Sequence, residues 1–383
     1  MTNDSTNETA RLDGVHLTDE AWMARVLVLA HRGAALAHPN PMVGAVILKN
    51  ERVVGEGFHT YEGRKHAEIL AIEQARANAR RATLYVNLEP CCHIGRTGPC
   101  AKAIIDAGIK RVVVAMRDPN PAVAGRGIRE LRAAGIAVAV GVREEDARHL
   151  NEAFAKWIRT KLPFVTLKTA LTLDGRIAAR TGSTTWITSD ASREEVQRMR
   201  HEADALLTGI GTVLTDDPRM TDRTKIPRRN PLVRVIVDSK LRIPLKSGIV
   251  KSADSDVLIF TTQSAGSSKA QLLRKAGVEI VQVRSRRGHA DLRHVLREMG
   301  KRQILSVILE AGSELNGAAF TGDLVDKMVL FYAPKIMGAS GVPMAQLPSQ
   351  WFKRSSALSQ LSFRRYGPDF VVQGYFHDVY RNH

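Results

Sequence analysis

Apolar and polar residues alternate along the first part of the chain in runs that predict helices and strands in turn. Residues 19–37 carry apolar side chains at helical spacing, Val26 and Leu29 among them, and predict a helix. Residues 38–58 give two apolar runs around a polar turn at 49–52, which predicts a β-hairpin. Further helices are expected at 66–80, 99–108 and 127–135, and strands at 82–88, 109–116 and 136–142. This alternation predicts a layered α/β domain.

The second part of the chain repeats this alternation after a break. A polar helix is expected at 143–160, and Pro163 ends it before a new strand at 164–171. Strands are then expected at 203–209, 232–239, 256–262, 277–283, 304–312 and 326–338, with helices between several of them. The predicted organisation is a mobile tail at 1–18, one α/β domain at 19–161 and a second at 162–383.

Composition agrees with two soluble domains. A chain of 383 residues exceeds what one hydrophobic core usually supports, and 44% hydrophobic with 25% charged residues is typical of globular proteins. No apolar run is long enough to cross a bilayer, and the first residues lack the apolar centre of a signal peptide. We therefore expect a cytoplasmic protein, in which thiols stay reduced.

The net charge of +17 favours an anionic partner, either nucleic acid or a phosphorylated small molecule. The basic residues are mostly scattered singly along the chain. A generally basic surface explains that pattern equally well, so charge alone does not identify the ligand.

All three cysteines, Cys91, Cys92 and Cys100, fall within one short segment. In a reducing compartment such a cluster more often indicates a metal or catalysis than a disulfide. Imidazole and thiolate are preferred zinc ligands, and a catalytic zinc needs three protein ligands and one open position. His66, Cys91 and Cys100 would supply the three. Two alternatives stay open: a closed structural site with His93 as fourth ligand, and Cys92 in place of Cys91.

Glu68 adds a chemical reason to expect catalysis. It lies two residues after His66, about 200° around a helix, so both reach one site only if the helix points its N-terminus there. Zinc deaminases use H-x-E followed by P-C-x-x-C, where zinc acidifies a water and the glutamate moves its proton to the leaving amine. “HAE” and “EPC” match, but eight residues separate Cys91 from Cys100, which suggests additional substrate contacts.

Longer motifs resemble one family over nearly all of the chain from about residue 20. “HPNPMVGAVI”, “LEPCCHIGRTGPC” and “DPNPAVAGRGIRELRAAGI” resemble the deaminase half of the bifunctional riboflavin-biosynthesis deaminase–reductases. “LKTALTLDGRIA”, “GTVLTDDPRMT”, “LEAGSELNGA” and “APKIMG” resemble the reductase half. Cys92 departs from the serine that this family often has there.

The resemblance implies a cytidine-deaminase-like three-layer α/β domain and then a dihydrofolate-reductase-like α/β domain. It implies zinc-dependent deamination of a diaminopyrimidinone carrying a ribosylamino 5′-phosphate, then NADPH-dependent reduction of the ribosyl group to ribityl. The implied cofactors are Zn²⁺ and NADPH. The implied partners are phosphorylated pyrimidine substrates, with no nucleic acid and no membrane, and a homo-oligomer, foremost a dimer.

Site residues in the second domain follow from the resemblance and from glycine-containing loops where a strand meets a helix N-terminus, which can bind phosphate. The residues expected to bind NADP are Ala170, Trp186, Thr212, Asp216, Ser239, Gly312 and Ser313. The residues expected to bind substrate are Thr184, Arg200, Met220, Arg223 and Glu310, with Lys168 and Asp174 as neighbours of the reacting sugar. Asn40, in the first domain, matches a substrate-holding position of related deaminases.

Some of these residues have ordinary structural explanations. Asn40 precedes Pro41 and fits an Asx turn, and Lys168 with Asp174 fits a partly buried salt bridge. The preference for NADPH or NADH depends on which residue at the end of the strand expected at 232–239 faces the cofactor, because successive side chains of a strand face opposite ways. We expect Asp238 to point away from the cofactor and Ser239 to face its 2′-phosphate, with Lys240 or Arg242 adding charge.

Three other functions fit part of the sequence. A nucleic-acid-editing deaminase fits the charge and the zinc motif, but not the long cysteine loop or the cofactor-type loops of the second half. A non-catalytic NADP sensor has no need of Glu68. A single-activity enzyme would have lost motifs in one half, and both halves keep theirs.

Overall fold

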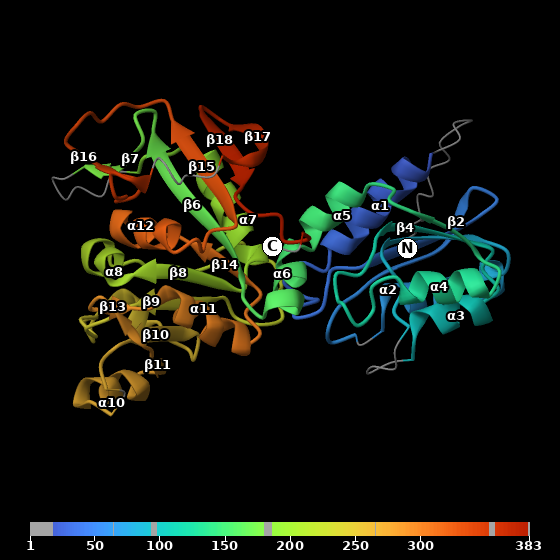
Figure 1. Cartoon of the computed structure of the whole chain (residues 1–383), viewed down its shortest axis with the longest axis horizontal. Helices are drawn as coiled ribbons and strands as arrows, with labels where there is room; N and C mark the ends of the chain where they lie inside the picture. The colour runs from blue at the N-terminus through green and yellow to red at the C-terminus, as the bar shows by residue number, and fades with distance from the viewer. Residues whose placement is uncertain are drawn as a thin grey trace, which may run out of the picture. The chain divides into compact units, whose positions relative to one another are not determined.

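The computed structural model describes residues 18–63, 65–92, 98–179, 186–264, 266–351 and 357–381 (Figure 1). The tail expected at 1–18 lies outside these residues except for Thr18. The chain forms two compact units, one made of residues up to Gly33 with Met42–Leu150, the other of Ala34–Pro41 with residues from Asn151 onward. Within the described residues, no helix has the length and apolar character needed to span a membrane.

The first unit is a five-stranded sheet with helices on both faces. The strand order is β2-β1-β3-β4-β5, in which β1 is antiparallel to β2 and β3 while β3, β4 and β5 are parallel. Helices α1 and α5 cover one face, and α2, α3 and α4 the other (Figure 1). The bounds are α1 Asp19–His31, β1 Gly44–Lys49, β2 Arg52–Phe58, α2 Ala67–Ala75, β3 Thr83–Leu88, α3 Cys100–Asp106, β4 Arg111–Met116, α4 Arg126–Ala133, β5 Ala137–Val140 and α5 Glu144–Leu150.

Local sequence explains where these elements begin and pack. Thr18 caps α1 by accepting the N–H of Ala21 (3.3 Å). Strand β1 is buried on both faces, as its apolar run predicts. Gly44 opens that strand against α1, where a Cβ atom would lie 2.4 Å from the carbonyl oxygen of Val26. Only glycine allows this close approach of helix and sheet.

The second unit contains a nine-stranded sheet of order β11-β10-β9-β8-β14-β6-β15-β18-β17. The seven strands from β11 to β15 are parallel, and β18 and β17 are antiparallel at one edge. The bounds are α6 Glu152–Thr160, β6 Phe164–Thr172, β7 Arg176–Ala179, α7 Asp190–Glu202, β8 Ala205–Gly209, α8 Ile210–Asp216, β9 Val233–Val237, α9 Gly248–Lys251, β10 Val257–Thr261, α10 Ser268–Lys275, β11 Val278–Gln282, β12 Ser285–Arg286, β13 His289–Ala290, α11 Leu292–Lys301, β14 Ser306–Leu309, α12 Ser313–Thr321, β15 Lys327–Ala333, β16 Gly341–Pro343, β17 Ser359–Tyr366 and β18 Asp369–Tyr375.

Apolar cores cover both faces of this sheet, which accounts for its nearly continuous apolar strands. Successive residues of β9 point to opposite faces of the sheet. Val235 and Val237 belong to the core under α11 and α12, and Ile236 belongs to the core under α9 and α10. The carboxyl ends of the parallel strands therefore meet at one edge. In open α/β sheets, ligands bind in the crevice outside that edge.

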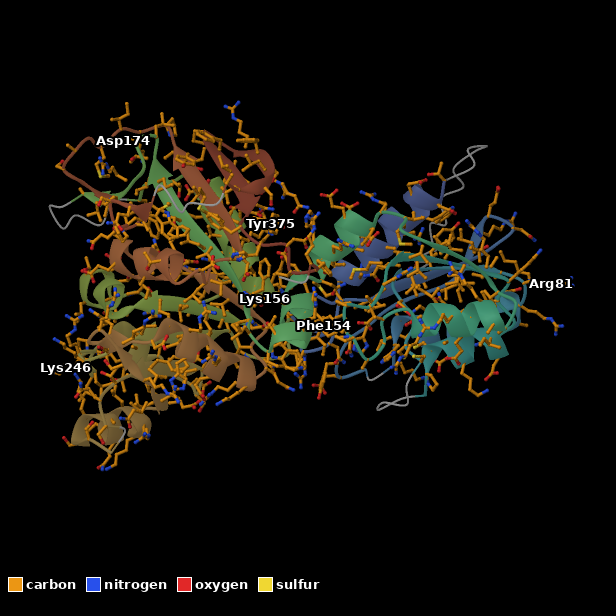
Figure 2. All side chains as sticks on the ribbon, in the orientation of Figure 1. Arg81, Phe154, Lys156, Asp174, Lys246 and Tyr375 are labelled. Atoms are coloured by element: carbon orange, nitrogen blue, oxygen red, sulfur yellow. The ribbon has the colours of Figure 1, made fainter. Side chains whose placement is uncertain are left out.

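The helix expected at 143–160 is two helices, because the chain breaks at Asn151 between α5 and α6. Helix α6 groups with the second unit. Lys156, labelled in Figure 2, pairs with buried Asp326 (2.5 Å), and Lys327 pairs with Glu152 (3.0 Å). These ion pairs explain why the compact units divide the chain before α6. A functional boundary near residue 161 stays a prediction.

Candidate active sites

His66, Cys91 and Cys100 gather their side chains at one point of the first unit. The Nδ1 atom of His66 lies 3.1 Å from the Cys100 sulfur and 3.5 Å from the Cys91 sulfur. The three potential ligand atoms all lie within 4.8 Å of one another, and no other group of three such side chains was found among the described residues.

Three element ends bring this cluster together. His66 is the extended N-cap residue of α2, Cys91 follows the end of β3, and Cys100 is the first residue of α3. The backbone N–H of Cys100 donates to the Cys91 sulfur (3.4 Å). Helix N-termini favour negative charge, so this position suits a thiolate.

The pKa values of the Cys91 and Cys100 thiols suit the binding of a metal cation. A bond from the Cys100 thiol lowers the pKa of Cys91 to about 4 against the effect of burial, and His66 lowers it further. The pKa of Cys100 is raised, because its thiol donates to Cys91 and because it is buried. The thiolate form of Cys91 is therefore favoured, and with the imidazole of His66 it offers the kind of donor set that zinc prefers.

Glu68 lies in the first turn of α2 with only 3% of its surface exposed. Burial raises the pKa of its carboxyl, which also contacts the Cys100 thiol. His66 and Glu68 thus converge on one point although they lie two residues apart, because α2 directs its N-terminus there. A buried carboxyl of raised pKa beside a ligand set suits general acid/base chemistry.

Cys92 does not enter the cluster. Cys92 is partly exposed, and burial, then Glu130 and Glu89, raise the pKa of its thiol. His93 lies in residues 93–97, outside the described residues, so its proposed role as a fourth ligand is untested.

Two acidic residues and one histidine near the cluster were not singled out from the sequence. Buried Glu89 accepts backbone N–H groups of Asp118, Gly125 and Ile128 (3.2, 2.8 and 3.2 Å) and so fixes the segment after β4. Burial, then Glu89 and Cys91, raise the pKa of Asp118 to about 7. The buried ring of His59 packs edge-on against His66, with centroids 5.4 Å apart. The N–H groups that Glu89 accepts lie 29 to 39 residues further along the chain, and only the motifs around these three residues signalled a role.

In the second unit, three of the predicted substrate residues meet at the carboxyl edge of the sheet. Glu310, just after β14, accepts hydrogen bonds from Nε and Nη2 of Arg200 (3.0 and 2.7 Å). Burial alone would raise the pKa of Glu310, but Arg200 and then Lys168 lower it to about 2. Burial lowers the pKa of Lys168, against the attraction of Glu310.

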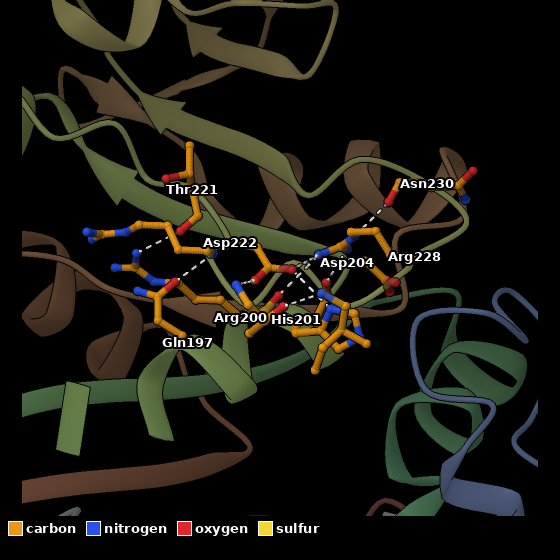
Figure 3. Close-up of polar contacts among 12 residues, drawn as sticks. Gln197, Arg200, His201, Asp204, Thr221, Asp222, Arg228 and Asn230 are labelled. Atoms are coloured by element: carbon orange, nitrogen blue, oxygen red, sulfur yellow. Dashed lines mark hydrogen bonds and ion pairs between the residues drawn. The ribbon is translucent and has the colours of Figure 1, made fainter. Parts of the chain in front are cut away.

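Met220 and Arg223 belong to the irregular segment after α8, which lies against α7 (Figure 3). Met220 is buried and has a positive φ of 55°. Arg200 donates from Nη1 to the carbonyl of Thr221 (3.2 Å), and the N–H of Arg223 donates to Oε1 of Gln197 (2.9 Å). The structure therefore brings Arg200 together with this segment.

Residues expected to hold the cofactor phosphates lie at two helix starts. Gly312 is the N-cap residue of α12, and a Cβ atom added to it would lie 4.0 Å from the Thr212 hydroxyl in the first turn of α8. The buried Ser313 hydroxyl has no hydrogen-bond partner among the described residues. Free helix N–H groups, an open glycine and an unsatisfied hydroxyl fit a phosphate group.

Other predicted cofactor residues lie around the same edge. Ala170 is half-buried on β6, and Asp216 ends α8, where burial raises the pKa of its carboxyl. Trp186 is 68% exposed, with the Arg193 guanidinium 4.9 Å from its ring centroid. Ser239 follows β9, and its hydroxyl accepts the N–H of Ala290 (2.8 Å).

Four other residues that the sequence singled out are Asp238, Asp174, Asn40 and Thr184. Asp238 is fully buried and accepts the N–H of Ile243 (2.7 Å). Asp174, labelled in Figure 2, accepts the Thr172 hydroxyl and two backbone N–H groups at 337–338; its ion pair is with Arg176 and not with Lys168. Asn40 lies in Ala34–Pro41, which groups with the second unit. Thr184 lies outside the described residues.

Comparisons with known proteins agree with both halves. The model of the RibD C-terminal domain matches residues 163–372, and that of the cytidine and deoxycytidylate deaminase zinc-binding region matches residues 17–116. The riboflavin biosynthesis protein RibD of Aquifex aeolicus is 40% identical over 354 residues, 92% of this chain and 97% of that protein. The Escherichia coli RibD is 39% identical, over 93% of this chain and 99% of that protein.

Solved structures agree over nearly the whole chain. Acinetobacter baumannii RibD superposes with a TM-score of 0.82 at 37% identity, covering 93% of this chain and 98% of that one. The Thermotoga maritima diaminohydroxyphosphoribosylaminopyrimidine deaminase/5-amino-6-(5-phosphoribosylamino)uracil reductase gives 0.81 at 38% identity, with the same coverage. The predicted two-domain fold class and the predicted cofactors, zinc and NADPH, are confirmed. The chain therefore belongs to the RibD family of bifunctional riboflavin-biosynthesis enzymes, in which a zinc-dependent deaminase domain precedes a reductase domain.

Proposed function

We propose that this chain first deaminates 2,5-diamino-6-(5-phosphoribosylamino)pyrimidin-4-one and then reduces the ribosyl group of the product to ribityl. The observation that carries the proposal is the convergence of His66, Cys91 and Cys100 with Glu68 at the start of α2. It occurs in a chain that aligns almost end to end with RibD proteins.

In the first reaction we assign His66, Cys91 and Cys100 as zinc ligands. Zinc, when bound, acidifies the water that attacks the pyrimidine carbon bearing the amine. Glu68 takes the proton from that water and passes it to the departing ammonia. Its burial supports this role, since a carboxyl of raised pKa is able both to hold and to release a proton. Asn40 is proposed to hold the pyrimidine.

In the second reaction NADPH, when bound, supplies the hydride. Gly312, Ser313 and Thr212 are proposed to hold its phosphates, with support from the open glycine and the unsatisfied Ser313 hydroxyl. Ala170, Trp186, Asp216 and Ser239 complete the proposed cofactor site. The proposed substrate residues are Lys168, Thr184, Arg200, Met220, Arg223 and Glu310.

The proposal extends to organisation and partners. We place the functional boundary near residue 161 and expect a homo-oligomer, foremost a dimer, in the cytoplasm, where the zinc-binding thiols stay reduced. The partners are phosphorylated pyrimidines and not nucleic acid. Substrate phosphate and NADPH are polyanions, which agrees with the net charge of +17.

A direct test incubates the zinc-loaded protein with the diaminopyrimidinone phosphate, with and without NADPH, and identifies the products by mass. We expect the deaminated ribosyl compound without NADPH and the ribityl compound with it. Release of ammonia from single-stranded nucleic acid but not from the pyrimidine would instead support an editing deaminase. An unchanged pyrimidine in the presence of zinc would overturn the proposal.

A further inference from the structure

A short basic hairpin follows strand β11 in the second unit. Strands β12 and β13 pair antiparallel, with Ser285 opposite Ala290 and Arg286 opposite His289. Arg287 and Gly288 form the two-residue turn, with φ values of 52° and 82°. Such a turn with positive φ at both positions matches the twist of a β-hairpin and gives this segment a defined shape.

The hairpin is tied to the carboxyl edge of the large sheet. The N–H of Ala290 donates to the Ser239 hydroxyl just after β9 (2.8 Å), and the N–H of Val283 donates to the carbonyl of Thr261 at the end of β10 (2.8 Å). The hydroxyl and the N–H of Thr262 both donate to the Ser239 carbonyl (2.7 and 3.1 Å). The Ser239 hydroxyl accepts from Ala290, so its own proton remains available to an anion.

The hairpin carries three basic side chains, two arginines and one histidine, whose charge no neighbouring carboxylate balances in the part of the chain that the structure describes. Arg286, Arg287 and His289 are exposed, and none of them forms an ion pair among the described residues. Arg286 and His289 lie directly opposite each other, an arrangement that destabilises a hairpin when both are charged. An anion bound between them would remove that repulsion.

Neighbouring carboxylates do not supply this anion. Asp238 is fully buried and binds the N–H of Ile243 (2.7 Å). Asp291 caps α11 by accepting the N–H of Arg293 (3.0 Å). The hairpin and Ser239 therefore present donors for an external anion at the edge of the sheet where cofactors bind.

We propose that the β12–β13 hairpin, through Arg286, Arg287 and His289 beside Ser239, recognises the 2′-phosphate of NADPH and so determines its preference over NADH. The inference rests on the proposed reductase function. Arginine forms paired hydrogen bonds with phosphate, and NADH has no group at this position to receive them.

The test uses the full chain and two cofactor fragments. Arg286→Ser and Arg287→Asn are combined, since asparagine tolerates the positive φ of residue 287. Lys275→Ser, at the exposed end of α10, removes charge elsewhere in the same unit as the control. Calorimetry measures binding of adenosine 2′-monophosphate and adenosine 5′-monophosphate, and steady-state kinetics give kcat/KM for NADPH and NADH.

We expect the double variant to bind adenosine 2′-monophosphate roughly tenfold more weakly or worse, the loss expected for a charge-assisted hydrogen bond. Binding of the 5′-monophosphate should stay unchanged, the kcat/KM ratio of NADPH to NADH should fall in parallel, and Lys275→Ser should change neither. Unchanged binding of the 2′-monophosphate in the double variant would overturn the proposal. If the unaltered protein reduces no substrate with either cofactor, the reductase proposal fails by itself, and fragment binding still decides the role of the hairpin.

Discussion

Replacing Glu310 by glutamine tests the electrostatics of the reductase site directly. The carboxylate accepts two bonds from Arg200, and the side chains of the pair are 17% and 14% exposed. Glutamine keeps the shape of Glu310 and removes its charge. The change leaves the Arg200 guanidinium in a largely buried position without its carboxylate.

The size of the effect follows from the pKa of Glu310. Burial raises it, but Arg200 and Lys168 lower it from 4.5 to about 2. A shift of that size corresponds to about 3 kcal/mol of stability at neutral pH. Removing one partner of a buried ion pair typically costs about 3–5 kcal/mol, which agrees. For a unit of this size we expect the melting temperature of the reductase unit to fall by roughly 6–12 °C.

The sign of the pH dependence gives a sharper test. The folded-state pKa is lowered, so the stabilisation is present above about pH 4.5 and is lost as pH falls toward 2. The difference in melting temperature between the unaltered protein and Glu310→Gln should therefore shrink as pH falls from 5 to 3. Glu314→Gln, an exposed position on α12, is the matched control.

Differential scanning calorimetry measures these transitions, and the shift caused by NADPH identifies the one that belongs to the reductase unit. A melting-temperature difference that is the same at pH 3 and pH 7 would refute the electrostatic explanation. So would a loss at pH 7 no larger than that of Glu314→Gln.

Three further predictions concern the assigned residues. Cys91→Ser should lose zinc and Cys92→Ser should keep it; metal analysis with the opposite result would move the ligand to Cys92. Glu68→Gln should slow ammonia release by about 10²–10⁴-fold with unchanged zinc content, because Glu68 moves a proton and binds no metal; near-normal deamination would contradict this role. Gly312→Trp should abolish NADPH binding measured by calorimetry but retain deamination, because its side chain would fill the space beside Thr212; loss of both activities in a folded protein would show that the two reactions are coupled.

Local patterns predicted the features that depend on few neighbours. The apolar runs at 82–88 and 109–116 become β3 and β4, and the start of α2 at Ala67 lets His66 and Glu68 reach one point. Pro99 and Gly108 bracket α3 as expected, with Gly108 at a φ of 68°. These features depend on residue spacing and backbone preference, which a single sequence displays.

Features set by distant contacts could not be predicted in this way. Strand β17 has no alternating apolar pattern, because most of its residues are exposed and its pairing with β18 defines it. The structural role of Glu89 depends on three backbone N–H groups that lie about 30 to 40 residues further along the chain. The break at Asn151 depends on ion pairs of α6 with residues more than 160 positions away. In each case the partner lies far along the chain, where periodicity gives no information.

The contacts of Arg200 limit what this residue does for the substrate. Its Nε and Nη2 atoms bind Glu310, and Nη1 binds the carbonyl of Thr221, so three of its five N–H donors already have protein acceptors. Lys168, in contrast, forms no ion pair among the described residues, although Glu310 acts on it at longer range. A substrate oxygen that needs a cation at this edge would meet Lys168 without breaking an existing bond. We infer that Arg200 fixes Glu310 and the segment that carries Met220 and Arg223 while its two remaining N–H donors stay available to the substrate, and that Lys168 offers a second cation outside any ion pair.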